Sequence, residues 1–289
     1  MKTLKLIVTI TICLLFSIQL NAQDSEYTLD ETYQISSEGT VHLNSNDAEV
    51  SIKGTDRSDV HLKVYRKVDV SGLEIKSGGK FNIEVEKRDG DLMIRESDTE
   101  NRTVVGKVTK EYTITIKVPT TVGVDIKGDD DTYNIASVNG RIAVEADDTE
   151  IALKNVGGND FYFDMDDGSI TMDKAEGNLK LSMDDGNFEV DQAAFTKVDA
   201  QYDDGSVVLT SRLAQDGKYR FDMDDGDLKF KITGGGGTFD IRHDNPSLDI
   251  GNSFENIKIE DDRSQFKLPG GNANIRIITD DGTIDLRTM

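Results

Sequence analysis

The sequence predicts an all-β protein whose C-terminal part is a right-handed parallel β-helix, or solenoid, of about nine rungs with 18 to 21 residues each. Three observations predict this fold. An Asp-Asp-Gly motif recurs at nearly constant spacing, apolar residues alternate with polar ones on both sides of it, and the chain has 26 glycines, few aromatic residues and no tryptophan. Short strands joined by tight turns suit that composition better than a large globular core does.

The Asp-Asp-Gly motif marks a corner between two strands. Nine such corners, some of them degenerate, can be placed along the chain, with their first residues at Asp129, Asp147, Asp166, Asp184, Asp203, Asp224, Asp244, Asp262 and Asp280. Aspartate hydrogen-bonds its own nearby backbone, and glycine adopts positive φ angles without a steric cost, so both favour a turn. A repeat of this regularity indicates a stack of equivalent units.

Each unit carries apolar residues at four fixed positions, five and three residues before the first aspartate and four and six residues after it. Around Asp166 these are Phe161 and Phe163 before the corner, and Ile170 and Met172 after it. Apolar residues two apart indicate a strand with one buried face. We therefore expect two strands in each unit, with their apolar side chains in one continuous core.

Two architectures can be built from such units. Asp-Gly between alternating strands is also a strong hairpin signal, so an antiparallel β-meander is the alternative. The nearly constant period favours the parallel solenoid, because one unit cannot bury its apolar face alone whereas stacked units share a core. The hexapeptide repeat of left-handed β-helices is not visible, which favours the right-handed form.

The chain divides into three expected regions. Residues 1–22 are predicted to be a signal peptide, because Lys2 and Lys5 precede an apolar run at residues 6–20, and Ala22 offers a small residue for cleavage. Residues 23–121 are predicted to form a β-rich cap that shields the first rung, with a polar loop at residues 96–110. Residues 122–289 are predicted to form the solenoid. The only cysteine, Cys13, lies in the signal, so the mature chain has no disulfide.

The charge of the mature chain limits its partners. Removal of the signal leaves 31 basic and 55 acidic residues, a formal charge of −24. Such a field repels nucleic acid and favours cations and basic partners. No second apolar stretch follows the signal, so we expect an exported protein without a membrane span, located in the periplasm, at the cell surface or outside the cell.

The aspartate corners are the most conspicuous chemical feature of the sequence. Stacked rungs would place them in one column, and a row of oxygen ligands suits Ca²⁺, which takes six to eight oxygens. The candidate calcium ligands are Asp166, Asp167, Asp184, Asp185, Asp203, Asp204, Asp224 and Asp225. Plain turn chemistry is the preferred interpretation, and it requires no cofactor.

No catalytic constellation stands out. A glycosidase needs two carboxyl groups in different environments, whereas the paired aspartates here are nearly identical in every unit. The three histidines, His42, His61 and His243, are scattered along the chain. We therefore expect a protein that is not an enzyme.

Residues 112–119 (Tyr-Thr-Ile-Thr-Ile-Lys-Val-Pro), followed by repeated Asp/Asn-Gly corners between short strands, resemble the bacterial putative-adhesin family. These are exported β-strand-repeat proteins with a domain of unknown function, related to the head domains of auto-transporter adhesin-like proteins. The resemblance implies an exported β-helix and attachment at a surface. It carries no catalytic residues to this chain.

Together these inferences predict a non-enzymatic surface or periplasmic protein that presents an acidic solenoid face to a protein or glycan partner, as an adhesin or an envelope scaffold. The alternative is a sensing or regulatory module of the envelope stress response that docks a membrane signalling protein.

Overall fold

The computed structural model describes residues 25–158, 160–244 and 246–289. The expected signal peptide lies outside these residues. Every regular element in them is a β-strand. The strands are β1 (Ser25–Gln34), β2 (Thr40–Asn46), β3 (Glu49–Thr55), β4 (Asp59–Arg88), β5 (Asp91–Pro119), β6 (Gly123–Asp129), β7 (Thr132–Ala136), β8 (Ile142–Ala146), β9 (Thr149–Val156), β10 (Asp160–Met165), β11 (Gly168–Met183), β12 (Asn187–Tyr202), β13 (Ser206–Arg212), β14 (Lys218–Met223), β15 (Asp227–Gly234), β16 (Gly237–His243), β17 (Ser247–Ile250), β18 (Glu255–Ile259), β19 (Arg263–Leu268), β20 (Ala273–Thr279) and β21 (Thr283–Thr288).

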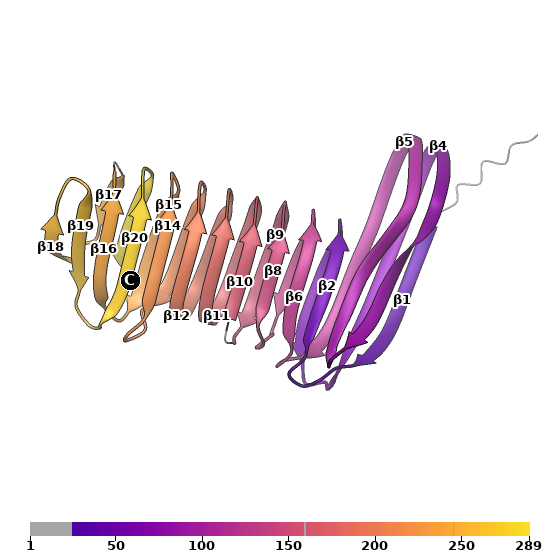
Figure 1. The fold of residues 1–289 in the computed structure, drawn as a ribbon, viewed down its shortest axis with the longest axis horizontal. Coiled ribbons are helices and arrows are strands. Elements are labelled where there is room, and N and C mark those ends of the chain that lie inside the picture. The colour runs from indigo at the N-terminus through magenta and orange to yellow at the C-terminus, as the bar shows by residue number, and fades with distance from the viewer. Residues whose placement is uncertain (1–24, 159, 245) are drawn as a thin grey trace, which may run out of the picture.

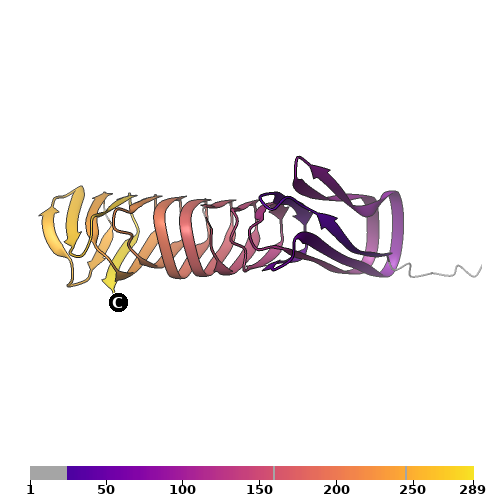
Figure 2. The same ribbon diagram turned by 90° about the horizontal axis from the view of Figure 1, so that it is seen from below.

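The strands stack into an elongated solenoid with two long parallel sheets (Figures 1 and 2). One sheet, the pre-corner sheet, contains the strands that lead into the corners. In spatial order it runs β2, β6, β8, β10, the second halves of β11 and β12, β14, β20 and β16. The post-corner sheet runs β3, β7, β9, the first halves of β11 and β12, β13, β15, β21 and β17. The described residues thus build nine two-strand rungs.

The pairing confirms the parallel solenoid and rejects the antiparallel meander for the stack. Ile170 of one rung lies opposite Phe188 of the next, and Phe188 lies opposite Val207 of the rung after that. Phe163 pairs in parallel with Leu181 and does not form a hairpin with Ile170. Only a stack brings equivalent residues together in this way. The right-handed winding stays a prediction.

The predicted core positions are buried in all but four cases. Phe163, Phe188 and Phe221 are among the fully buried side chains, and each such side chain contributes about 1.5–3 kcal/mol when it leaves water. The four exceptions are Leu248 and Ile250, which are partly buried, and Ile257 and Ile259, which are exposed. All four belong to the predicted units at Asp244 and Asp262.

The order of the rungs at the C-terminal end corrects the expected sequential stack. The last rung of the chain, β20 and β21, is inserted between the rung of β14 and β15 and the rung of β16 and β17. Asp280 therefore stacks on Asp224, not beyond Asp262. The chain therefore forms the outer rung of β16 and β17 first and later returns to form the rung of β20 and β21 between it and the rung of β14 and β15.

The predicted unit at Asp262 is not a solenoid rung. β19 runs antiparallel to β16 and to β18, so both strands of this unit extend the pre-corner sheet. The corner lacks glycine, and the N–H of Glu260 donates to the carbonyl of Arg263 at 2.8 Å in a tight hairpin turn. Arg263 also donates two hydrogen bonds to Asp240 of β16, at 2.7 and 2.9 Å. These contacts turn β19 back alongside β16.

The predicted cap region, residues 23–121, contains one regular rung of the solenoid. β2 and β3 pair in parallel with β6 and β7. The boundary expected near residue 121 therefore does not separate two folds, since one rung lies before it in the sequence.

The rest of the cap is a long antiparallel ribbon of β4 and β5, with β1 along one edge of β4. One end of β5 pairs with β2 and the other end pairs with β3, so the ribbon connects the two sheets across the end of the stack. Its middle projects beyond the body of the solenoid (Figure 1). Residues 96–110, expected as a polar loop, are part of β5.

Candidate functional site

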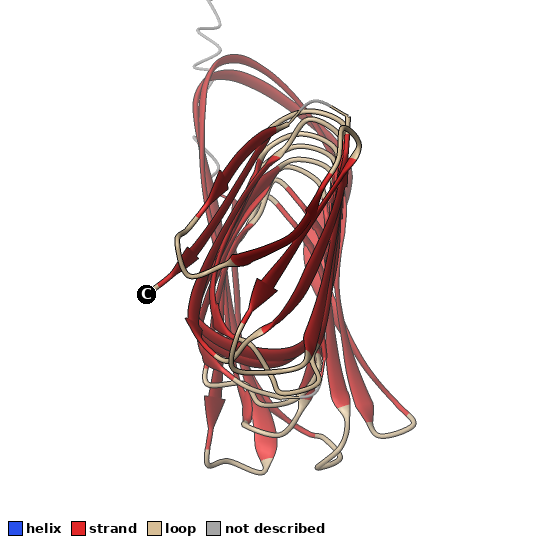
Figure 3. Cartoon of the chain, turned by 90° about the vertical axis from the view of Figure 1, so that its left-hand side faces the viewer, coloured by secondary structure: helices blue, strands red, loops and turns tan. Residues whose placement is uncertain are grey.

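The candidate site is the column of aspartate pairs along one edge of the solenoid, here called the corner ladder. Its members are Asp129, Asp130, Asp147, Asp148, Asp166, Asp167, Asp184, Asp185, Asp203, Asp204, Asp224, Asp225, Asp280 and Asp281. They occupy the turns between the pre-corner and post-corner strands. The turns lie one above another at one end of the rungs, as the end-on view in Figure 3 illustrates.

Five of the ladder corners have glycine after the aspartate pair, where successive turns approach closely. Gly186 and Gly205 have φ angles of 138° and 102°, a region that other residues rarely adopt. A Cβ atom on Gly205 would lie 2.1 Å from the carbonyl oxygen of Gly186. A side chain at this position would therefore push neighbouring rungs apart.

Backbone hydrogen bonds hold the ladder in register. The N–H of Asp185 donates to the carbonyl of Asp166 at 2.9 Å, and the N–H of Asp204 donates to that of Asp184 at 3.0 Å. The same bond joins Asp225 to the rung below it, at 3.1 Å. Because the backbone sets this spacing, aspartates of successive rungs stay about one strand spacing apart.

Repulsion between neighbouring carboxylates contributes to raised pKa values at four ladder residues, Asp129, Asp166, Asp167 and Asp225. The neighbouring charge of Asp147 is the main cause that raises the pKa of Asp166 above its usual range. Partial desolvation and then the charges of Asp281 and Asp204 raise the pKa of Asp225. Asp281 is close enough to raise the pKa of Asp225 because the C-terminal rung of β20 and β21 stacks on the rung of β14 and β15. A cation at the ladder would relieve this repulsion.

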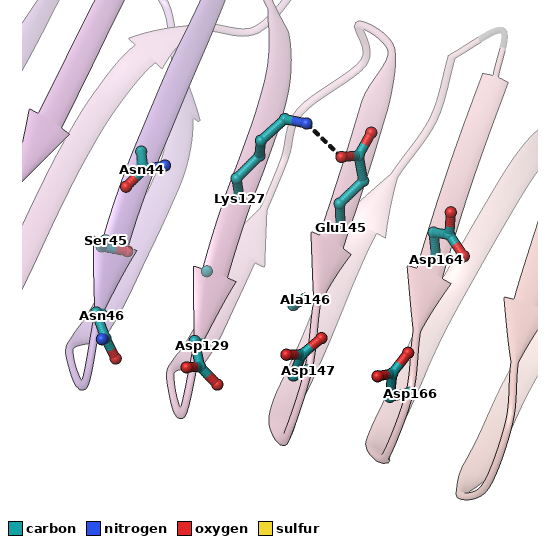
Figure 4. Close-up of a pocket in the computed structure, with 11 residues that line it drawn as sticks. Asn44, Ser45, Asn46, Lys127, Asp129, Glu145, Ala146, Asp147, Asp164 and Asp166 are labelled. Atoms are coloured by element: carbon teal, nitrogen blue, oxygen red, sulfur yellow. Dashed lines mark hydrogen bonds and ion pairs between the residues drawn. The ribbon is translucent and has the colours of Figure 1, made fainter.

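The N-terminal end of the ladder opens into a shallow depression of about 500 Å³. Asp129, Asp147 and Asp166 line it in one row, and Lys127 forms an ion pair with Glu145 beside them (Figure 4). The lining is thus acidic, with one exposed ion pair at its margin. Its shape and charge suit a cationic group that lies across several rungs.

A buried polar network, which sequence reasoning missed, fastens the first rung beneath this depression. Asp131 is almost fully buried. Its carboxylate accepts hydrogen bonds from the Tyr133 hydroxyl at 2.5 Å, from Ser45 Oγ at 3.1 Å and from the N–H of Ala48 at 2.6 Å. Because Ser45 and Ala48 belong to the β2–β3 rung, the network joins that rung to the next. Its only sequence signal is a third aspartate at the position where five other corners have glycine.

The structure brings together all eight predicted ladder residues, from Asp166 to Asp225, on four consecutive corners. Among the described residues, no three or more His, Cys, Asp or Glu side chains are placed so that they could hold a metal ion. Calcium binding by the ladder stays a prediction.

The three histidines have different partners. The ring of His243 hydrogen-bonds to Ser264 Oγ at 3.0 Å, and that of His61 contacts Asp30 at 2.7 Å. His42 lies 3.5 Å from both Asp91 and Asp125 on the outer face of β2. They form no common site.

Asn46 and Asp47 extend the ladder at its N-terminal end. The N–H of Asp47 donates to the carbonyl of Asp129 at 3.1 Å, as in the other corners. A signal for this rung was present, because Val41, Leu43, Val50 and Ile52 lie at the same four offsets from Asn46 as the core residues of the other units.

Comparison with known families places the chain in the Toastrack DUF4097 family, which matches residues 40–287. The chain belongs to this family. The match begins at the first residue of β2, so it includes the rung that lies within the predicted cap. A search of curated protein sequences finds no match.

Solved structures that match this chain have low sequence identity to it. A putative adhesin from Bacteroides fragilis is 12% identical, with 92% of this chain and 98% of that chain covered and a TM-score of 0.46. A putative adhesin from Parabacteroides distasonis is 11% identical, with 90% and 97% covered and a TM-score of 0.45. A putative lipid binding protein from the same organism is 10% identical, with 93% and 98% covered and a TM-score of 0.32.

The described residues contain no helix with the length and apolar character needed to cross a membrane.

Proposed function

We propose that this protein is an exported, non-enzymatic binding protein that uses the corner ladder to hold a cationic partner at the bacterial cell surface or in the envelope. The partner is a protein or a glycan with a row of positive charges. The observation that carries the proposal is the ladder itself, in which backbone hydrogen bonds hold like charges close together. The expected signal peptide supports export.

The ladder supports a binding role because a ligand of opposite charge would relieve its repulsion near neutral pH. In the free protein the charge of Asp147 raises the pKa of Asp166, and desolvation followed by the charges of neighbouring rungs raises the pKa values of Asp167 and Asp225. A cationic ligand that spans several rungs would gain from each carboxylate it meets, which favours an extended ligand over a single small cation. The nearly identical rungs suit repeated weak contacts, as expected of an adhesin or an envelope scaffold.

The test is capture of partners from a bacterial envelope extract by the mature chain. The ladder variant Asp166→Asn/Asp184→Asn/Asp203→Asn/Asp224→Asn should lose most of the captured material. A control variant, Glu150→Gln/Glu176→Gln/Glu189→Gln/Asp191→Asn, removes the same number of charges from exposed positions outside the ladder. It should capture as the wild type does. Equal losses in both variants would contradict a specific role of the ladder.

A further inference from the structure

The part of the β4–β5 ribbon that projects beyond the body of the solenoid has an inner and an outer side (Figure 1). Nearer the solenoid, Val64 and Val68 of β4 are buried, so the side that they share faces inward. Residues of a strand alternate between its two sides, and directly opposite residues of the paired strand point the same way. The pairing of β4 with β5 runs without a register shift from residue 61 to residue 78. The two sides can therefore be followed to the tip.

The inner side of the tip carries charges that pair with one another. Glu74 and Lys76 of β4 lie there, together with Glu100 and Arg102 of β5. Each of the two cations forms ion pairs with both glutamates, at 2.7 to 3.7 Å, and the four side chains are only 14% to 25% exposed. The charges on this side thus neutralise one another and are largely turned away from solvent.

The outer side of the tip carries aliphatic residues, and we call it the tip face. Leu73 lies directly opposite Val105 and beside Ile75, and these side chains are 64%, 71% and 71% exposed. The other members of the tip face are Ser71, Ser77, Asn101, Thr103 and Lys107. Aliphatic residues outside and charges inside invert the pattern of an antiparallel ribbon whose outer side faces water. The inversion fits an apolar environment on the outer side.

The charge of the tip face suits an anionic surface. The face contains one lysine and no acidic residue, in a chain with 55 acidic and 33 basic residues. Lys110 pairs at 3.1 Å with Asp47, at the first corner of the stack. Val105 is five residues further toward the tip, which is about 17 Å at about 3.3 Å per residue. This distance is about twice the Debye length at physiological ionic strength, so the charge of the ladder is largely screened at the tip face.

The size of the tip face favours a lipid surface over a second protein. A stable protein interface needs about 20–30 residues on each side, whereas the tip face has eight, from Ser71 to Ser77 and from Asn101 to Lys107. A few aliphatic side chains with a basic residue beside them are enough to contact the boundary between lipid headgroups and acyl chains.

The edges of the ribbon also limit how it can meet a bilayer. Beyond Val68 the outer edge of β4 pairs with no other described strand, and neither does the outer edge of β5 between residues 96 and 112. Unpaired backbone groups need water and are not tolerated in the hydrocarbon core. The ribbon is therefore suited to lie on the surface of a bilayer and not to cross it.

The position of the N-terminal end agrees with contact at a membrane. β1 begins at Ser25, which pairs with Val68, five residues before Leu73. The expected signal peptide, residues 1–22, precedes β1 almost directly and is removed on export. The end of the chain that leaves the membrane last is thus close to the tip face.

We propose that the tip face binds the surface of an anionic phospholipid bilayer. Leu73, Ile75 and Val105 enter the boundary between headgroups and acyl chains, and Lys107 contacts the lipid phosphates. This inference goes beyond the function proposed for the ladder, which involves no lipid. Contact through the tip face leaves the ladder available to its own partner.

The test is flotation of the mature chain with lipid vesicles at physiological ionic strength. Vesicles of phosphatidylglycerol and phosphatidylcholine in equal parts should bind the chain, and vesicles of phosphatidylcholine alone should bind it less. Leu73→Ser/Ile75→Ser should lower the partition coefficient by about tenfold or more. The matched control, Ile257→Ser/Ile259→Ser, removes two exposed isoleucines of β18 at the other end of the molecule. It should bind as the wild type does.

The contribution of charge is tested separately. Lys107→Glu should weaken binding to the anionic vesicles by about fivefold or more, because it replaces the attraction of one lysine by repulsion. Its binding to phosphatidylcholine vesicles should not change. Lys218→Glu, at an exposed position on the solenoid, should have little effect on either. Melting curves verify that each variant is folded.

A fluorescent label locates the contact. The expected mature chain has no cysteine, so a polarity-sensitive dye can be attached to Thr103→Cys in the tip face or to Thr283→Cys, at an exposed position on β21. Emission from the label in the tip face should shift to shorter wavelength when anionic vesicles are added. Emission from the label on β21 should not shift.

No binding to the anionic vesicles would overturn the proposal. So would equal losses in Leu73→Ser/Ile75→Ser and in its control, or an emission shift from the label on β21 alone. A dimer in solution that Leu73→Ser/Ile75→Ser dissociates, without vesicle binding, would overturn it in favour of a second copy at the tip face. The ladder variant should bind vesicles at least as well as the wild type, so failure of this site and failure of the ladder can be told apart.

Discussion

Replacement of Phe221 tests the packing of the solenoid core most simply. Phe221 is fully buried in β14, between Ala200 of one neighbouring rung and Ile277 of the other. Its ring contacts that of Phe230 across the core, with centroids 5.8 Å apart. Because Ala200 is small, it does not fill the space that the ring leaves.

Phe221→Ala should therefore lower the free energy of unfolding by about 3–5 kcal/mol, the range for a buried phenylalanine that leaves a cavity. The neighbouring Arg220 provides the matched control. Its side chain is 45% exposed and pairs with Asp222 on the outer face, so Arg220→Ala should change stability by less than about 1 kcal/mol.

The assay is equilibrium unfolding in urea, followed by circular dichroism and by tyrosine fluorescence, so that coincident transitions establish two-state behaviour. A Phe221→Ala midpoint close to that of Arg220→Ala would refute the inward and outward assignment of β14. It would also refute the stacking of Phe221 on Ala200 and Ile277.

Three further predictions address the ladder and the first rung. At one fixed ionic strength, millimolar calcium and magnesium should raise the melting temperature by a small and similar amount, since both screen the ladder; a calcium-selective rise that Asp184→Asn/Asp203→Asn abolishes would instead establish a calcium site. The pKa values of Asp129, Asp166, Asp167 and Asp225 are raised in the folded state, so protonation favours folding. The melting temperature should therefore rise as the pH falls from 7 toward about 4, and a steady fall over that range would contradict ladder repulsion. Below about pH 3.8 stability should drop, because Asp30 and Asp240, whose pKa values ion pairs lower, become protonated. Tyr133→Phe removes one hydrogen bond to buried Asp131 and should destabilise the protein by about 1–3 kcal/mol in urea unfolding, whereas Tyr162→Phe, at a more exposed position on β10, should have little effect.

The rung architecture could be predicted from the sequence because every unit repeats the same local physics. Alternation places Phe161 and Phe163 on one face, and the Asp-Asp-Gly corner sets where the strand turns. The resulting period alone predicts that Ile170 lies beside Phe188, and no long-range contact has to be known in advance. For the same reason the ladder residues from Asp166 to Asp225 could be predicted as one column.

The order of the rungs could not be predicted in this way. β20 and β21 carry the same core pattern as their neighbours, so the pattern fits several places in the stack equally well. Their place depends on long-range pairing with β14 and β15. The β2–β3 rung was missed because the β4–β5 ribbon separates it from the regular period.

The strand arrangement of the unit at Asp262 depends on long-range contacts, which the periodic pattern of the sequence does not predict. Its core pattern is intact, with Ile257 and Ile259 before the corner and Phe266 and Leu268 after it. The pairing of Arg263 with Asp240 holds the second strand of this unit back along the first sheet.

The central claim is that ladder carboxylates repel one another in the free protein and that a cationic partner relieves the repulsion. The most direct measurement is a ¹³C NMR titration of the aspartate carboxyl groups, with and without a saturating lysine oligomer. Asp166 and Asp225 should titrate above the usual aspartate range in the free protein and at lower pH when the oligomer is bound, while Asp30 and Asp240 stay unchanged. Ladder pKa values in the usual range that do not respond to the oligomer would contradict the claim.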